Sequence, residues 1–451
     1  MTTLLVKGGQ LVDELSVRRA DLLIEDGRVA AILPPEHDRP ADRVVDASGL
    51  HVLPGVVDAH VHFNEPGRTE WEGFLTGTTA AAAGGVTTVC DMPLNCHPPT
   101  LDSRSLSLKR AAISDHAVID YALWGGLVPG SLEHLAELQQ GGVVGVKAFL
   151  CDSGLADFPH LDEFGLVEAM QRCAALEPPL LLALHAEDAA QTQRLGQAAR
   201  ASGRRSALDW AASRPPQTEV DAVDAALTAA AETGARLHFV HISTAAAARL
   251  IAAARAEGQD VSVETCPHYL LLDDADLARL GSFGKCAPPL RARSEVDQLW
   301  EALVDGTIDW VASDHSPCPP DMKQTDDIWS AWGGLAGVQT LLPALLSEAF
   351  LARGMSLPKL VSLTSGTPSR RLGLYPKKGV LDPGSDADLV LIDLDRAWTL
   401  QASDLRTRWP IHPLLGRTFR GQVVATFVRG TEVWADGRLC VEPGFGQPAR
   451  V

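Results

Sequence analysis

Eight short apolar segments, spread through the middle of the chain and separated by stretches with helical periodicity, constrain the fold of this sequence most strongly. They are 56–62, 87–93, 118–127, 145–150, 180–187, 237–243, 261–267 and 310–316. Apolar runs of this length are typical of buried strands. Eight strands that alternate with helices predict an α/β fold, a (β/α)8 barrel of the TIM type. A doubly wound open sheet is the alternative, but no GxGxxG-like loop follows the first strand.

The two ends of the chain have a different pattern, of strand-like runs joined by tight turns. Asp26-Gly27 and Asp436-Gly437 are hairpin signals. Each end alone is too short to bury a sheet face, so we expect one small β-sandwich domain built from both termini. Two separate β appendages are the alternative. The predicted division is therefore 1–54 and 376–451 for the two parts of the β domain, with the barrel at 55–375.

Charge and composition exclude several classes of partner. The formal net charge of −18 argues against nucleic acid or an anionic membrane as a partner. No apolar run reaches the roughly 18 residues of a membrane span, and the first residues do not have the pattern of a signal peptide. The eight cysteines include no CxxC pair, which favours reduced thiols over a disulfide framework. We therefore expect a soluble, cytoplasmic protein.

Histidines and a carboxylate stand where several of the apolar segments end. His60 and His62 form an HxH pair whose members point to the same side of a strand. His185, His241 and Asp314 end three other segments, and in a barrel the carboxyl ends of all strands meet on one face. One such histidine alone would more often be a core residue, and one aspartate a helix N-cap. The set of five together predicts a metal site.

Lys147 lies within an apolar strand segment, VVGVKAFL, where a charged lysine is normally excluded. Beside divalent cations an ammonium group could neither coordinate nor tolerate the positive charge. A neutral amine that has captured CO2 becomes a carbamate, with one negative charge and two oxygens that can bridge two ions. A structural lysine paired with a carboxylate is the alternative. The sequence thus predicts two divalent metal ions and a carboxylated Lys147; zinc is favoured, and cobalt, manganese or iron also suit these ligands.

The combined motifs resemble those of the cyclic amidohydrolases, which include dihydroorotases, hydantoinases (dihydropyrimidinases) and allantoinases. The motifs are HxH at 60–62, GVKAF at 145–149, HAE at 185–187, VHIS at 240–243 and SDH at 313–315. The resemblance extends over the whole chain and implies a carboxylated lysine and a homotetramer. It also implies that one ion is held by His60, His62 and Asp314, and the other by His185 and His241.

For activity, the resemblance implies hydrolysis of a cyclic amide by a hydroxide that bridges the two ions. Asp314 would take the proton of this hydroxide and return it to the departing ring nitrogen, as a general base that becomes a general acid. A non-catalytic scaffolding relative is the alternative from another class of function. Such relatives lose metal ligands, whereas all six ligand positions are present here.

Only a few residues discriminate between the cyclic substrates of the different family members. Dihydroorotases carry an arginine two positions after HxH, where this chain has Asn64. Hydantoinases carry a tyrosine five residues after the modified lysine, where this chain has Asp152. Stretches such as NEPGRTEWEGF from Asn64 and AWGGLAG from Ala331 look like those of allantoinases. They favour a small cyclic ureide as the substrate, (S)-allantoin opened to allantoate in purine catabolism. A hydantoinase (dihydropyrimidinase) or a dihydroorotase is the alternative.

To bind a neutral ring of this kind, the protein needs side-chain amides that form hydrogen bonds with it. It also needs backbone without side chains that can come close to the ring. The predicted substrate contacts are Asn64, Asn95, Ala287, Gly333 and Gly334. Each has an alternative role in turn formation. Trp329 and Trp332 are candidates for a pocket wall, with core packing as the alternative.

Overall fold

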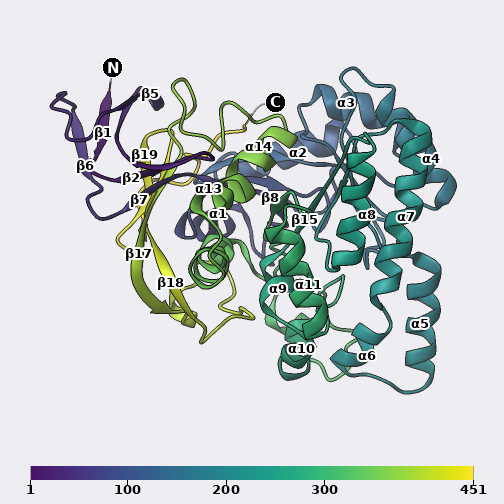
Figure 1. The fold of residues 1–451 in the computed structure, drawn as a ribbon. Coiled ribbons are helices and arrows are strands. Elements are labelled where there is room, and N and C mark those ends of the chain that lie inside the picture. The colour runs from purple at the N-terminus through teal and green to yellow at the C-terminus, as the bar shows by residue number, and fades with distance from the viewer. Residues whose placement is uncertain (1, 450–451) are drawn as a thin grey trace.

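The computed structural model describes residues 2–449, and its central part is an α/β arrangement of parallel strands covered by helices (Figure 1). One parallel sheet contains β8 (Val56–Val61), β9 (Val86–Asp91) and β10 (Asp120–Leu123). A second contains β11 (Gly125–Gly126), β12 (Val146–Phe149), β13 (Leu182–His185), β14 (Leu237–Phe239), β15 (Val261–Thr265) and β16 (Trp310–Val311). Each of the eight predicted strand segments overlaps at least one of these strands.

The helices follow the strands in alternation, as the periodicity predicts. They are α1 (Phe74–Ala83), α2 (Ser103–Ile113), α3 (Leu135–Gln140), α4 (Glu163–Ala174), α5 (Ala189–Ala201), α6 (Ala207–Ala212), α7 (Pro216–Thr233), α8 (Ala245–Ala256), α9 (Pro267–Leu271), α10 (Asp274–Leu280), α11 (Arg293–Val304), α12 (Leu341–Leu345), α13 (Leu357–Val361) and α14 (Thr367–Arg371). Their boundaries have local causes. Helix α7 begins with Pro216 in its first turn and ends at Gly234, whose φ of 69° suits a residue without a side chain.

The two parallel sheets are connected to each other by backbone hydrogen bonds on both sides. On one side, Val144 N, two residues before β12, donates to Leu123 O in β10 at 3.0 Å. On the other side, His62 N donates to His315 O at 2.7 Å, and Val61 pairs with His315 in a parallel bridge. The chain just after β16 therefore lies beside the end of β8, although more than 250 residues separate the two in sequence.

Strands from both ends of the chain pair in one sheet, so the purple and yellow strands of Figure 1 lie together. This sheet has the order β20-β19-β18-β17-β7-β2-β3, and a second has the order β5-β4-β1-β6. Their bounds are β1 (Thr3–Lys7), β2 (Gln10–Val12), β3 (Val17–Arg19), β4 (Asp21–Glu25), β5 (Arg28–Leu33), β6 (Arg43–Asp46), β7 (His51–Pro54), β17 (Leu389–Thr399), β18 (Thr418–Val428), β19 (Thr431–Ala435) and β20 (Arg438–Leu439). The direct contact between the ends is antiparallel pairing of β7 with β17, in which Leu53 faces Val390.

Both predicted hairpin turns are confirmed. Asp26 and Gly27 have φ values of 48° and 80° and connect β4 to β5. Asp436 and Gly437, at 53° and 74°, connect β19 to β20. Two successive residues with positive φ match the twist of paired strands, and Asp-Gly adopts this geometry readily.

The eight cysteines are all free thiols, and only Cys440 is exposed. This agrees with the expected absence of a disulfide framework. Within residues 2–449, the structure contains no helix with the length and apolar character needed to cross a bilayer.

Candidate metal centre

The six predicted metal ligands come together at the carboxyl ends of the parallel strands, and all are buried. His60 lies in β8, Lys147 in β12 and His185 at the last position of β13. His241 and Asp314 lie just beyond β14 and β16, which are shorter than the segments predicted from the sequence. Both residues have a positive φ, 40° for His241 and 44° for Asp314, and this left-handed conformation ends the extended backbone.

Left-handed backbone is concentrated at this site. Asn64 and Asn95 also have a positive φ, 65° and 68°, so that four of the eight non-glycine residues with this conformation within 2–449 are predicted site residues. Such a conformation costs about 1–3 kcal/mol for a non-glycine residue and persists where the surrounding structure holds it. These four positions lie two to four residues beyond the end of a strand, where the turn of the chain sets the direction of a polar side chain.

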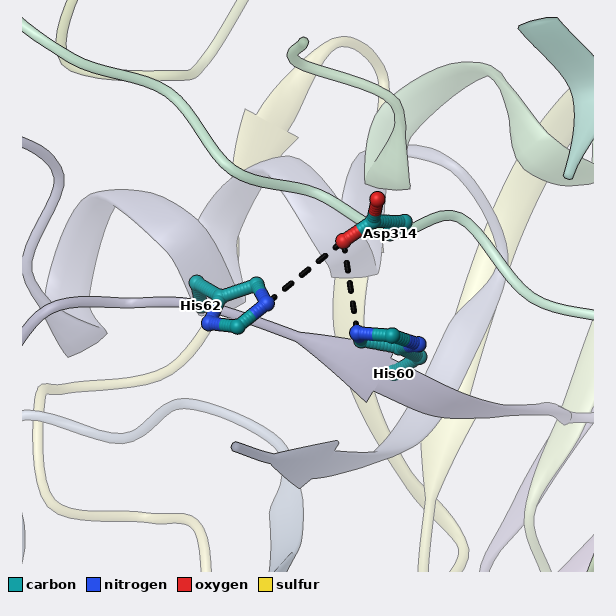
Figure 2. A group of neighbouring side chains, drawn as sticks. All are labelled: His60, His62 and Asp314. Carbon is teal, nitrogen blue, oxygen red and sulfur yellow. Dashed lines mark ion pairs between the residues drawn. The ribbon is translucent and has the colours of Figure 1, made fainter. Parts of the chain in front are cut away.

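The first group of ligands consists of His60, His62 and Asp314 (Figure 2). Asp314 Oδ1 lies 3.3 Å from His60 Nε2 and 3.5 Å from His62 Nε2. Burial raises the pKa of Asp314, but the neighbouring His60 and His62 outweigh this and lower it to about 2. An ionised carboxylate oxygen that converges with two imidazole nitrogens is a suitable donor set for a divalent cation.

The second group consists of His185, His241 and Lys147. His185 Nδ1 and His241 Nε2 lie 3.0 Å apart. Burial lowers the pKa of both imidazoles, which favours the neutral, metal-binding form. Lys147 Nζ is buried and has no hydrogen-bond partner among residues 2–449. Burial lowers the pKa of Lys147 to about 7, although Glu264 and Asp314 oppose this. Among residues 2–449 no carboxylate pairs with Lys147, which counts against the alternative of a structural ion pair.

Two buried glutamates that the sequence analysis did not single out hold histidines of the site. Glu264 Oε1 lies 2.6 Å from His60 Nδ1, and its other oxygen accepts a hydrogen bond from Trp310 Nε1 at 2.8 Å. Burial raises the pKa of Glu264, but His60 and His238 outweigh this and hold it well below its usual range. The ionised Glu264 therefore keeps the proton of His60 on Nδ1 and leaves Nε2 free to coordinate a metal.

Glu187 has the same role for His185. Its Oε2 lies 2.8 Å from His185 Nε2 and accepts a hydrogen bond from Arg214 Nη1 at 2.5 Å. Burial raises the pKa of Glu187, but Arg214 and His185 outweigh this and lower it to about 2. Cys151 lies within 4.8 Å of both residues, but burial raises the pKa of its thiol to about 12, so it is a poor metal ligand. His185 is thus oriented with Nδ1 toward His241.

A signal for these glutamates was present in the sequence. Glu187 belongs to the HAE motif, and Glu264 lies in the apolar strand segment VSVETCP. A carboxylate in a buried strand requires a partner. The partner itself could not be identified, because His60 and Glu264 are 204 residues apart in sequence.

We expect Glu264→Gln to weaken metal binding about 10- to 100-fold, because a neutral amide fixes the protonation state of His60 less strongly. Metal titration of the metal-free protein, with metal content measured after dialysis, would check this. Glu232→Gln, on the exposed side of α7, is the matched control and should bind metal as the wild type does. Equal metal affinity of Glu264→Gln and Glu232→Gln would refute the role of Glu264.

Four of the five predicted substrate contacts line the same cavity. Asn95, Ala287, Gly333 and Gly334 line it together with the metal-ligand candidates. Asn95 Nδ2 donates to Ser316 Oγ at 3.2 Å. Gly334 has no room for a side chain, since a Cβ there would lie 2.3 Å from Ser316 O. Packing against Ser316 therefore requires glycine here, and its bare backbone lies on the cavity wall.

Asn64 is buried but is not among the residues, within 2–449, that line this cavity. Its Nδ2 is 3.5 Å from Pro317 O, and its Oδ1 is buried without a partner in the same range. Its contact with substrate stays a prediction. Of the two tryptophans, Trp332 lines the cavity, whereas Trp329 lines a different cleft.

Comparison with known proteins gives a consistent result over the whole chain. A family model described as "Amidohydrolase family" matches residues 51–433. An allantoinase of Rubrobacter xylanophilus is 47% identical over 449 residues, which cover 99% of this chain and 98% of the relative. An allantoinase of Deinococcus radiodurans is 46% identical, with 98% and 97% covered.

Similar folds occur among solved structures. The L-hydantoinase (dihydropyrimidinase) from Arthrobacter aurescens has a TM-score of 0.97 and 36% sequence identity, and the match covers 100% of both chains. The dihydropyrimidinase from Brevibacillus agri has a TM-score of 0.92 and 29% identity, with 100% of this chain and 99% of the other covered.

Proposed function

This chain belongs to the amidohydrolase family, and we propose that it opens the ring of (S)-allantoin with water to give allantoate. It is a hydrolase of C–N bonds in cyclic amides. The observation that carries the specific proposal is 41–47% identity to several allantoinases over nearly the full length of both chains. In the reaction, water adds its oxygen to the ring carbonyl, the C–N bond breaks, the ring nitrogen takes a proton and the new acid ionises.

Two divalent metal ions fit the residues of the site. His60, His62 and Asp314 would hold one ion, and His185 and His241 the other. The buried Nζ of Lys147, which has no partner within residues 2–449, supports a carbamate that would complete both sets. When bound, the ions supply Lewis acidity that polarises the carbonyl and lowers the pKa of water. Zinc is our first choice for these ligands.

The chain's own groups move the proton. Asp314 is the proposed general base, and its carboxylate passes the proton on to the departing ring nitrogen, because an amide anion is a poor leaving group. Its ionised form is favoured, since the neighbouring histidines lower its pKa to about 2 against the effect of burial. Glu264 and Glu187 hold His60 and His185 at 2.6 and 2.8 Å, which keeps the site in one arrangement through the reaction.

We further propose that the parallel strands close into a complete (β/α)8 barrel and that the two terminal sheets form a β-sandwich. The hydrogen bond from His62 N to His315 O supports closure between the last and first strands, and Ser313 N also donates to Asp58 Oδ1 at 3.0 Å. A buried cluster that includes Leu4, Val6, Leu389 and Phe427 supports a core between the two sheets. The domain limits 1–54, 55–375 and 376–451 stay our prediction.

Assembly and location are part of the proposal as well. The family resemblance supports a homotetramer, and seven buried free thiols are in keeping with a cytoplasmic protein. We propose that the small-molecule substrate is the binding partner. The net charge of −18 supports this, because it disfavours binding to nucleic acid or to an anionic membrane.

A hydantoinase is the second candidate, because the similar solved structures described above carry hydantoinase and dihydropyrimidinase titles. We expect kcat/KM for allantoin to exceed that for hydantoin, dihydrouracil and dihydroorotate by about 100-fold, as polar pockets discriminate strongly. Parallel assays of the four rings with the metal-loaded protein would measure this. Turnover of hydantoin without turnover of allantoin would replace the proposed substrate by the second candidate.

A further inference from the structure

One buried hydrogen-bond donor at the substrate cavity has no partner. Trp332 lines the cavity together with Asn95, Gly333 and Gly334. Its indole Nε1 is buried and has no hydrogen-bond partner among residues 2–449. Buried indole N–H groups are normally paired, because an unpaired donor that has lost its water is unfavourable. A ligand acceptor that reached this N–H would therefore pair an otherwise unpaired donor.

Other tryptophans of the chain show the usual arrangement. Trp329, only three residues earlier, donates from Nε1 to Arg204 O at 2.7 Å. Trp210 donates to Cys286 O at 3.0 Å, and Trp310 donates to Glu264. The unpaired state of Trp332 is thus not a general property of these indoles, and it coincides with a position on the cavity wall.

The Trp332 ring is held in place by its surroundings. Its backbone N donates to Met322 O at 2.9 Å, and its ring packs edge-on against Trp71 with centroids 4.7 Å apart. The preceding loop is held by the buried Lys285, whose Nζ donates to Ile328 O at 2.8 Å and to Ala331 O at 2.7 Å. A donor fixed in this way loses little freedom when it binds a ligand.

We propose that the Trp332 indole N–H donates a hydrogen bond to the carbonyl oxygen of the ureido substituent of the substrate. This inference rests on the proposed function. We assign the ring carbonyls to the metal-ligand residues and to the backbone of Gly333 and Gly334, which line the same cavity. The ureido carbonyl is the remaining strong acceptor of allantoin, and hydantoin lacks it. Trp332 would therefore select the substituted ring over the bare ring.

Trp332→Phe tests the contact, because it removes the N–H and keeps an aromatic ring against Trp71. We expect kcat/KM for allantoin to fall about 10-fold and that for hydantoin to change less than about 2-fold. Trp329→Phe is the matched control, since it removes an indole N–H that is already bonded to Arg204 O. This control should leave the ratio of the two kcat/KM values unchanged.

Binding to the metal-free protein gives a readout that is independent of turnover. Calorimetry with allantoin should show a Kd about 10-fold higher for Trp332→Phe than for Trp329→Phe. Equal losses for allantoin and hydantoin, or equal Kd values in the two variants, would overturn the assignment of Trp332. If the wild type does not open allantoin at all, the proposed function fails and this inference fails with it. If the wild type does open allantoin, an unchanged ratio of kcat/KM for allantoin to kcat/KM for hydantoin in Trp332→Phe overturns only the Trp332 contact.

Discussion

Lys147→Met is expected to lower kcat/KM by at least about 1,000-fold, which corresponds to about 4 kcal/mol of transition-state stabilisation, and to abolish binding of two metal ions. The reason is that the proposed carbamate would be lost, and Lys147 is the one lysine among the residues within 2–449 that line the cavity. Methionine fills nearly the same volume, so the apolar surroundings of the side chain stay packed. Metal content after dialysis and steady-state turnover would be measured, with the exposed Lys377→Ala as the control.

The stability of the same variant separates this role from a structural one. Lys147 Nζ is buried and has no hydrogen-bond partner among residues 2–449. Its replacement by methionine should therefore leave the free energy of unfolding of the metal-free protein unchanged or raise it. A marked loss of stability together with retained metal binding would show that Lys147 serves only the fold.

The pH dependence of carbamate formation follows from the pKa of Lys147, which burial lowers to about 7. Only the neutral amine reacts with CO2. At a fixed concentration of dissolved CO2, reactivation of metal-free protein by metal should therefore become faster as the pH rises toward 7 and level off above it. Isotopically labelled bicarbonate should be retained by the wild type and not by Lys147→Met. Reactivation that is independent of bicarbonate would contradict the carbamate.

Asp314→Asn is expected to lower kcat by about 100- to 10,000-fold, the usual contribution of a general acid–base group. Asparagine is similar in size but cannot take up and return the proton. Turnover at saturating metal and substrate, together with metal content and thermal unfolding, would show whether the chemistry or the fold is affected. Asp224→Asn, exposed on α7, should behave as the wild type. A kcat for Asp314→Asn within about tenfold of the wild type would exclude the proposed proton transfer.

The residue types of the site were predictable because their local setting is unusual. His60, His62 and His185 follow apolar strand residues, and Lys147 lies among them, so each is recognisable from its immediate neighbours. Parallel strands of an α/β fold bring their carboxyl ends to one face. The structure confirms this convergence, with Asp314 Oδ1 3.3 Å from His60 Nε2 and His185 Nδ1 3.0 Å from His241 Nε2.

The exact lengths of two strands were not predictable. The sequence pattern extends the strand segments as far as His241 and Asp314, but β14 ends at Phe239 and β16 at Val311. The backbone leaves the extended region at His241 and Asp314, each with a positive φ. Contacts with distant parts of the chain favour this conformation, and a local pattern of apolar residues does not contain them.

The sequence by itself determined the class of fold, and it predicted the candidate metal ligands and the strand segment that leads to each, because these depend on patterns over a few residues. Only the tertiary structure decided which groups support them. Glu264 reaches His60 across 204 residues of sequence, and Glu187 connects His185 to Arg214. The unpaired indole N–H of Trp332 is likewise a property of its surroundings. Hydrogen bonding depends on distances of about 3 Å between atoms, and such distances exist only once the chain has folded.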